Sequence, residues 1–185
     1  MRTEISQPTA ECQHPERWSM HDEMSAEDEV LNFLCNITEL LKPDVVVETG
    51  THLGLSACSI GLGLSRNGSG HLFSFENNLD LAARASETIA QRALLGIVSV
   101  IPESSIERPF AESIDVLFCD SDHDVRIREL EHFWPNLTPQ SIILVHDVNT
   151  GCHNEYRQRL IEWAKGRMSV VFLPTPRGLA ICQKL

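Results

Sequence analysis

The segment Val45-Val46-Val47-Glu48-Thr49-Gly50-Thr51-His52-Leu53-Gly54 decides the fold. Its β-branched start is typical of a buried strand, and the strand runs into an acid, Glu48. A turn that contains two glycines follows, and the apolar stretch 55–64 suits a helix. A strand, a glycine turn and a helix in this order form the first part of a nucleotide-binding α/β unit.

A second acid stands where such a unit places its ribose-binding carboxylate. Glu76 ends the short apolar strand 72–75 and lies 22 positions after Gly54. At about this distance a carboxylate can accept hydrogen bonds from the two ribose hydroxyls. The sequence therefore predicts a cofactor that contains adenosine.

The glycine spacing and the charge of the turn distinguish between adenosine cofactors. From Gly50 the pattern is G-x-x-x-G, so the dinucleotide pattern G-x-G-x-x-G is absent. Glu48 at the mouth of the turn opposes a pyrophosphate but suits a ligand that carries an ammonium and a sulfonium group. S-adenosylmethionine therefore fits better than NAD. Two alternatives stay open, an NAD-dependent oxidoreductase and a non-catalytic module that keeps the cofactor fold for binding or assembly.

Composition and charge exclude several classes of partner. The chain has 185 residues, which favours one domain, and a net charge of -11. That charge argues against nucleic acid and anionic membranes, which attract basic surfaces. No apolar run reaches the roughly 20 residues of a membrane span, and no signal peptide is visible. Six cysteines lie scattered without C-x-x-C spacing, which favours reduced thiols in a cytoplasmic protein.

The acids are concentrated at the start of the chain. Residues 1–30 hold eight acids and two arginines, a net charge of -6. We expect residues 1–24 to form an acidic tail or lid, and residues 25–185 to form a single domain. Ser25 followed by Asp28 resembles a capping box and predicts the start of the first helix.

Strands and helices alternate along the rest of the chain. Apolar strands are expected at 45–48, 72–75, 98–101, 114–119, 142–145, 170–173 and 179–182, with only the last two joined directly. Alternation predicts an α/β fold with a doubly wound, mostly parallel seven-stranded sheet and a C-terminal antiparallel hairpin. Ligands of such sheets bind at the carboxyl ends of the strands. Polar residues follow several of these strands: Glu48, Glu76, Asp120, His146 and Asp147.

Four segments together resemble a known family. They are 46–56 (VVETGTHLGLS), 75–76 (FE), 114–123 (IDVLFCDSDH) and 145–148 (VHDV). The chain resembles the class I S-adenosylmethionine-dependent methyltransferases, and among them the small-molecule O-methyltransferases related to cephalosporin hydroxylase-type and catechol-type enzymes. The resemblance implies a Rossmann-like methyltransferase fold and methyl transfer to a small molecule, on a hydroxyl oxygen.

The resemblance also implies roles for particular residues. Glu48, Gly50 and Gly54 would line the methionine part of the cofactor, Glu76 would bind the ribose, and Glu103 with Ser104 would lie beside the adenine. The full expected cofactor set is Glu48, Gly50, Thr51, Gly54, Ser56, Glu76, Asn77, Glu103, Ser104 and Asp120.

Asp120, His146 and Asp147 occupy the positions at which catechol-type relatives bind a divalent metal ion. Histidine replaces a carboxylate there, which disfavours magnesium and leaves a softer ion, or none. The candidate catalytic residues are His146, Asp120 and His123. His146 is either a metal ligand or general base, or a histidine oriented within a satisfied polar network. With little chain left for a substrate cap, we expect a homodimer to complete the acceptor pocket.

Overall fold

The computed structural model describes residues 8–185, so the first seven residues of the expected acidic tail lie outside the described residues. The strands are β1 (Val45–Thr49), β2 (His71–Phe75), β3 (Val98–Ile101), β4 (Ile114–Cys119), β5 (Leu137–His146), β6 (Met168–Leu173) and β7 (Leu179–Lys184). The helices are α1 (Asp28–Leu41), α2 (Leu55–Asn67), α3 (Leu79–Gln91), α4 (His123–Phe133) and α5 (Asn154–Ala164), with short 3-10 helices at Pro15–Arg17 and Trp134–Asn136.

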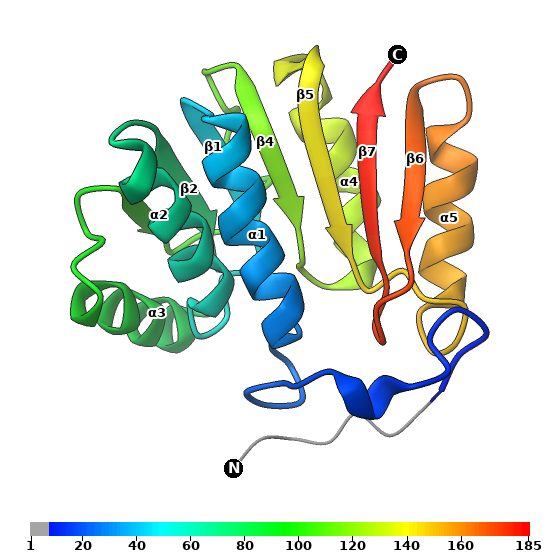
Figure 1. Ribbon diagram of the computed structural model, residues 1–185. Helices are drawn as coiled ribbons and strands as arrows, with labels where there is room; N and C mark the ends of the chain where they lie inside the picture. The colour runs from blue at the N-terminus through cyan, green and yellow to red at the C-terminus, as the bar shows by residue number, and fades with distance from the viewer. Residues whose placement is uncertain (1–7) are drawn as a thin grey trace.

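The seven strands form one sheet in the order β3-β2-β1-β4-β5-β7-β6. Neighbours from β3 to β5 are parallel, whereas β7 runs antiparallel to both β5 and β6. The predicted doubly wound sheet with its C-terminal hairpin is therefore confirmed. In Figure 1, β4 and β5 point down toward the N-terminal segment, which runs along that edge of the sheet.

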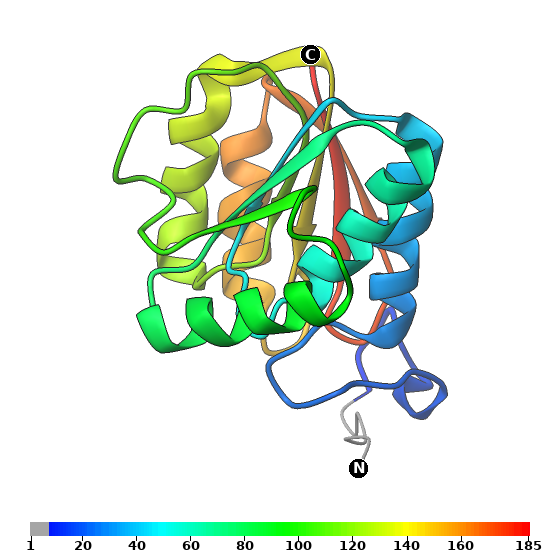
Figure 2. The ribbon, with the colours of Figure 1, turned by 90° about the vertical axis from the view of Figure 1, so that its left-hand side faces the viewer.

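Helices cover both faces of the sheet and create two cores. Figure 2 shows α1 and α2 on one side and α4 and α5 on the other. The first core contains buried side chains such as Leu34 of α1 and Ile60 of α2, and Ile89 of α3 belongs to it too. The second core contains Leu130 of α4 and Leu160 of α5. Burial of apolar surface on both faces explains why β1 begins with three valines and β4 is almost continuously apolar.

One connection differs from the predicted alternation. No helix joins β3 to β4, and residues 102–113 form bends and turns instead. The segment contains Pro102 and Pro109, several charges and no helical apolar repeat, so it cannot form an amphipathic helix on the sheet. The expectation that only the last two strands are joined without a helix was therefore wrong.

The start of α1 also differs from the predicted capping box. The helix begins at Asp28, and neither Ser25 nor Glu27 caps it with a side chain. The backbone N–H groups of Met24 and Ser25 instead donate to Asp22 Oδ1, at 2.9 and 2.7 Å. Glu27 is fully buried and its carboxylate points elsewhere, as described below.

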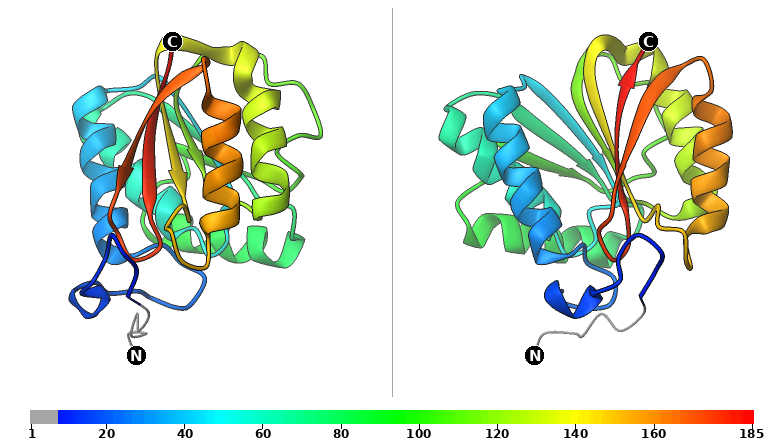
Figure 3. Two further views of the ribbon diagram at one scale, coloured as in Figure 1. Left: turned by 90° about the vertical axis from the view of Figure 1, so that its right-hand side faces the viewer. Right: turned by 45° about the vertical axis from the view of Figure 1, so that its right-hand side comes forward.

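Residues 8–27 form a strap across the carboxyl ends of the strands (Figure 3). Glu11 of the strap accepts a hydrogen bond from Thr150 and lies 3.3 Å from the guanidinium of Arg157. All six cysteines are free, and five of them are buried. Within residues 8–185, the helices are too short or too polar to cross a membrane.

Candidate active site

A cavity of about 540 Å³ opens at the carboxyl ends of the central strands. Its volume lies within the about 300–1,000 Å³ usual for cofactor and small-molecule sites. The predicted site residues that line it are Gly50, Thr51, Ser56, Glu76, Asn77, Glu103, Ser104, Asp120, His123 and Asp147. Glu48, Gly54 and His146 do not line it.

The turn at Gly50 brings the ends of three strands together. The N–H groups of Gly50 and Thr51 both donate to the carbonyl of Phe75 on β2, at 2.9 and 3.2 Å, and Asp120 N donates to Thr49 O at 3.0 Å. Gly50 has φ +86°, and a Cβ at this position would lie 2.4 Å from the carbonyl oxygen of Asp120. Only glycine meets both requirements, because it tolerates the left-handed conformation and has no side chain to collide.

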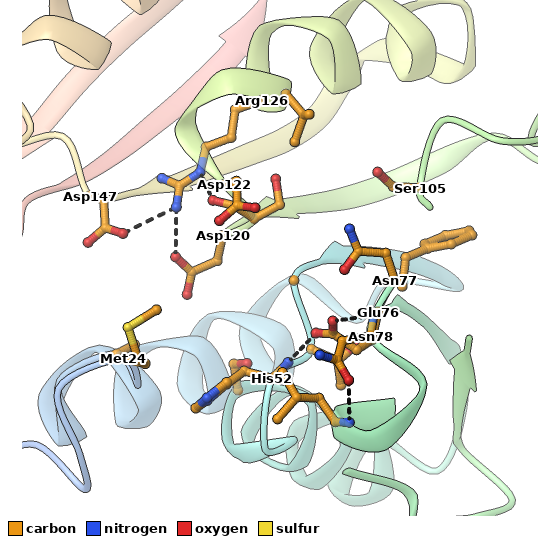
Figure 4. Close-up of a pocket in the computed structure, with 18 of the residues that line it drawn as sticks. Met24, His52, Glu76, Asn77, Asn78, Ser105, Asp120, Asp122, Arg126 and Asp147 are labelled. Carbon is orange, nitrogen blue, oxygen red and sulfur yellow. Dashed lines mark hydrogen bonds and ion pairs between the residues drawn. The ribbon is translucent and has the colours of Figure 1, made fainter. Parts of the chain in front are cut away.

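Glu76 is held rigidly at the wall of the cavity (Figure 4). Its Oε2 accepts from the backbone N–H of His52 at 2.8 Å, and its Oε1 accepts from that of Asn78 at 3.0 Å. The side chain lies close to the start of α3, which Asn78 caps by accepting from the backbone N–H groups of Asp80 and Leu81. An ionised carboxylate has about four lone-pair sites, so Glu76 can still accept two hydroxyl donors from a ligand.

Glu48 lies behind the glycine turn. It is fully buried, and its Oε2 accepts a hydrogen bond from Ser74 Oγ at 2.5 Å. Ser74 in turn contacts Thr51 Oγ1 at 2.6 Å. Burial raises the pKa of Glu48 to about 7, although the nearby Ser56 and Ser74 hydroxyls oppose the rise. Glu48 therefore supports the turn from beneath, with Oε1 buried and without a hydrogen-bond partner among residues 8–185.

The opposite wall is fixed by a buried carboxylate of α4. Glu129 is 1% exposed and accepts hydrogen bonds from the hydroxyls of Ser105, Ser121 and Thr49, at 2.5, 2.6 and 3.0 Å. These hydroxyls come from the β3–β4 connection, the end of β4 and the end of β1. Glu103 is paired with Arg108, whose Nε donates to Glu103 Oε2 at 3.0 Å.

The structure brings Asp120, His146 and Asp147 together, with one ligand atom of each within 4.8 Å of the others. A guanidinium already lies between the two aspartates, because Arg126 Nη2 contacts Asp120 Oδ1 at 3.3 Å and Asp147 Oδ2 at 3.2 Å (Figure 4). Arg177 binds both oxygens of Asp147 from the other side. The residues thus do not fit a divalent metal ion, because cationic side chains take the positions next to its would-be ligands.

His146 is fully buried, and both ring nitrogens face carboxylates. Nδ1 lies 3.0 Å from Asp120 Oδ1, and Nε2 lies 2.7 Å from Glu27 Oε2. Although burial lowers it, the pKa of His146 is raised to about 10 by Asp120, Asp147 and Glu27. Two roles were considered for His146, a member of a fully hydrogen-bonded polar network and a general base or metal ligand. The geometry favours the first.

His123 occupies the side of the cavity next to this network. Its ring stacks on Tyr156, with centroids 5.1 Å apart, and its Nε2 lies 3.9 Å from Asp147 Oδ2. Burial and the charge of Arg126 lower the pKa of His123, so the neutral imidazole predominates at neutral pH. A neutral imidazole can accept a proton, and Asp147 would stabilise the resulting cation.

The sequence between residues 47 and 148 matches the model of a family described as a methyltransferase domain. The chain belongs to this methyltransferase family. A search of curated proteins found no sequence with a significant match.

Solved structures of other methyltransferases share the fold. An S-adenosylhomocysteine-bound methyltransferase from Podospora anserina has 17% identity and a TM-score of 0.77, covering 88% of this chain and 81% of its own. A Bacillus cereus O-methyltransferase in complex with S-adenosylhomocysteine has 18% identity and a TM-score of 0.76, covering 89% and 84%. TomG, an O-methyltransferase of tomaymycin synthesis from Streptomyces achromogenes, has 15% identity and a TM-score of 0.74, covering 88% and 82%.

Several residues of the candidate site were not predicted from sequence. Arg126 and Glu129 lie on the buried face of α4, together with Leu130 and Phe133. Two charged residues on a face that is otherwise apolar were a signal that could have identified them. Arg177, in the turn between β6 and β7, carries no such signal.

Proposed function

We propose that this methyltransferase transfers the methyl group of S-adenosylmethionine to a hydroxyl oxygen of a small molecule. The observation that carries the proposal is Glu76, fixed at the wall of the cavity by two backbone N–H groups, one of them from His52 in the glycine turn. In the proposed complex, Glu76 accepts the ribose hydroxyls. Solved relatives with S-adenosylmethionine or S-adenosylhomocysteine bound, and with the same fold, support the choice of cofactor.

The electrostatics of the cavity favour a cationic donor. Among residues 8–185, six carboxylates line it against two guanidiniums, those of Arg126 and Arg177, and a cleft with an excess of one sign of charge attracts ligands of the opposite sign. The six are Glu76, Glu103, Asp120, Asp122, Glu129 and Asp147. Asp120 accepts its two contacts on Oδ1, which leaves Oδ2 for a ligand. The sulfonium and ammonium groups of the donor are positively charged and would be attracted by these carboxylates.

In the proposed reaction, the acceptor oxygen attacks the sulfonium methyl carbon in line with the leaving sulfur. The carbon–sulfur electron pair stays on sulfur, which becomes the thioether of S-adenosylhomocysteine. His123 takes the hydroxyl proton: with Nε2 turned toward Asp147, Nδ1 is the nitrogen left for the acceptor. Most of the rate enhancement would come from holding donor and acceptor in near-attack geometry.

Isothermal titration with S-adenosylhomocysteine tests the cofactor. The wild-type protein should bind it, and Glu76→Gln should weaken binding about tenfold or more, since hydrogen bonds to a charged group contribute about 1.5–3 kcal/mol. Glu87→Gln, on the exposed side of α3, is the matched control and should change nothing. No heat of binding with folded wild-type protein would refute the proposal, and a parallel titration with NADH tests the oxidoreductase alternative.

The acceptor side needs two further measurements. A screen of hydroxylated small molecules with methyl-labelled donor should yield a labelled product. Binding of the donor without transfer to any acceptor would favour the non-catalytic module. Light scattering tests the proposed homodimer.

A further inference from the structure

Six charged side chains form a buried cluster beside the cavity. Three are acidic and three are cationic, and each touches at least one of opposite charge. We call them the ion cluster: Glu27, Asp120, Asp147, Arg126, His146 and Arg177. Their placement decides what the metal-ligand positions of this chain can hold.

Arg126 fills the space between the two aspartates. It is 2% exposed, and Nη2 lies 3.3 Å from Asp120 Oδ1 and 3.2 Å from Asp147 Oδ2. Its other donors are also engaged, since Nε donates to Ser121 O and Nη1 to His146 O. The fork of a guanidinium is rigid and always charged. The two carbonyls hold the fork in place, and its Nη2 bridges the two carboxylates as a bound cation would.

Arg177 closes the other side of Asp147. Its Nε lies 2.6 Å from Oδ1 and its Nη2 lies 2.9 Å from Oδ2, a bidentate pair. The same guanidinium donates to the strap through the carbonyls of Glu23 and Ser25, at 3.4 and 3.0 Å. Both oxygens of Asp147 are therefore already bound to cationic donors.

His146 offers no free lone pair to a metal ion. A ligating imidazole must be neutral and present an unprotonated nitrogen. Here Nδ1 faces Asp120 at 3.0 Å and Nε2 faces Glu27 at 2.7 Å. Because both partners are acceptors, both ring nitrogens are best satisfied as donors.

The carboxylates of the ion cluster already have cationic or N–H partners. A divalent cation bound to Asp120 and Asp147 would have to displace the guanidinium contacts of Arg126 and Arg177. Removing one partner of a buried ion pair is strongly unfavourable.

We propose that Arg126, assisted by Arg177 and His146, takes the place of a divalent cation in this methyltransferase. The enzyme would then bind its cofactor without a metal ion, with Arg126 as the positioning residue that sets Asp120 at the cavity wall. Cofactor binding without a metal ion rests on the proposed function, whereas the inability of these residues to bind a metal ion does not.

A second group of potential ligands shares the same carboxylate. His123, Asp147 and His153 have ligand atoms within 4.8 Å of one another, and His153 Nε2 lies 3.6 Å from Asp147 Oδ1. Ligation here would require Asp147 to give up its contacts with the arginines. A softer ion at this group is therefore the competing outcome that the experiment must detect.

The experiment is metal titration of the full chain, with and without S-adenosylhomocysteine. Mn²⁺ probes the oxygen-rich group by loss of its free-ion electron paramagnetic resonance signal, and Zn²⁺ probes the histidine group by calorimetry. We expect no stoichiometric binding of either ion, and EDTA should leave the Tm and the affinity for S-adenosylhomocysteine unchanged. Stoichiometric Mn²⁺ binding that Asp120→Asn abolishes, or Zn²⁺ binding that His153→Ala abolishes, would overturn the proposal.

A pair of variants tests Arg126 directly. Arg126→Gln removes the charge and leaves Asp120 and Asp147 undercompensated, so Mn²⁺ should now raise the Tm. Arg126→Lys keeps a positive charge and should stay indifferent to Mn²⁺. Absence of a Mn²⁺-dependent shift in folded Arg126→Gln would count against a cation-replacing role. If Arg126→Gln does not fold, the wild-type titrations above still decide.

The titration with S-adenosylhomocysteine separates the two proposals. Binding that survives EDTA supports both. Binding of S-adenosylhomocysteine that requires a metal ion would refute the metal-free inference and leave the proposed function standing. A protein that binds neither metal nor S-adenosylhomocysteine refutes the function and leaves the assignment of the ion cluster standing.

Discussion

The buried acid beneath the glycine turn should make the stability of the protein depend on pH. Glu48 has an ordinary pKa of 4.5, and burial raises it to about 7 in the folded state. Its folded pKa lies above the unfolded value, so the unfolded state loses the proton first as pH rises. The fold is therefore destabilised progressively between pH 4.5 and about 7, and the full cost is present above that range.

The size of this cost follows from the two pKa values. One pKa unit corresponds to about 1.4 kcal/mol, so a rise from 4.5 to about 7 corresponds to about 3 kcal/mol. Glu48→Gln removes the ionisation and keeps the side-chain shape. Relative to the wild type, the variant should gain about 3 kcal/mol in the free energy of unfolding between pH 4.5 and pH 8. In a domain of this size the gain equals a Tm increase of about 6–12 °C.

Urea unfolding of both proteins at several pH values, followed by circular dichroism, measures the gain. Comparing the difference between the two proteins across pH cancels the titration of all other groups, provided that they do not contact Glu48. Ser74→Ala is a useful companion, because loss of the hydroxyl should raise the pKa of Glu48 further and steepen the pH dependence. A difference between wild type and Glu48→Gln that stays constant from pH 4.5 to pH 8 would show that the reasoning is wrong.

Three further perturbations test other parts of the site. His123→Asn should lower turnover about 10²–10⁴-fold with S-adenosylhomocysteine affinity unchanged, and steady-state kinetics with unaltered turnover would exclude the general base. Glu27→Gln should destabilise the fold by about 3 kcal/mol or more, because it removes the carboxylate that pairs with Nε2 of buried His146. The pKa of Glu27 is lowered from 4.5 to about 2, and the pKa of His146 is raised from 6.5 to about 10. The pair therefore contributes fully to the free energy of unfolding between pH 4.5 and pH 6.5. The contribution is lost as pH falls through about 2 or rises through about 10. Urea unfolding of Glu27→Gln should therefore show its largest loss in that window, and an equal loss at pH 11 would contradict the pairing. Gly50→Ala should lower the free energy of unfolding by more than about 1 kcal/mol, because φ is +86° and the methyl group would collide with the carbonyl of Asp120. A variant with the Tm of the wild type would contradict this prediction.

Local patterns were sufficient to predict the first β-α-β unit, and its Gly50 and Glu76 lie at the cavity. The β-branched run before Glu48, the glycine turn and the spacing to Glu76 are all short-range signals, and these elements form as expected. The start of α1 was misplaced because Glu27 takes part in a tertiary contact with His146 and Arg177 rather than in capping. A local capping pattern carries no information about contacts with residues that are distant in the sequence.

The ion cluster could not be predicted for a similar reason. Asp120, His146 and Asp147 were grouped because the family resemblance places a metal site at these positions, and the structure does bring them together. Their partners come from places that neither the resemblance nor the strand pattern indicates, a helix face for Arg126 and a hairpin turn for Arg177. Residues grouped by resemblance can therefore lie together and still be bound to cationic side chains of the same chain.

The pairing of Glu27 with the far end of the chain has a consequence for the order of folding. Its two carboxylate oxygens find their partners at His146 and at the backbone N–H of Arg177, which is 150 residues away. During synthesis, the strap cannot settle until the last hairpin has emerged from the ribosome. The strap, whose residues 24–26 line the cavity, is therefore the last part to assemble, and a nascent chain halted before residue 177 would leave the cavity open to water on that side.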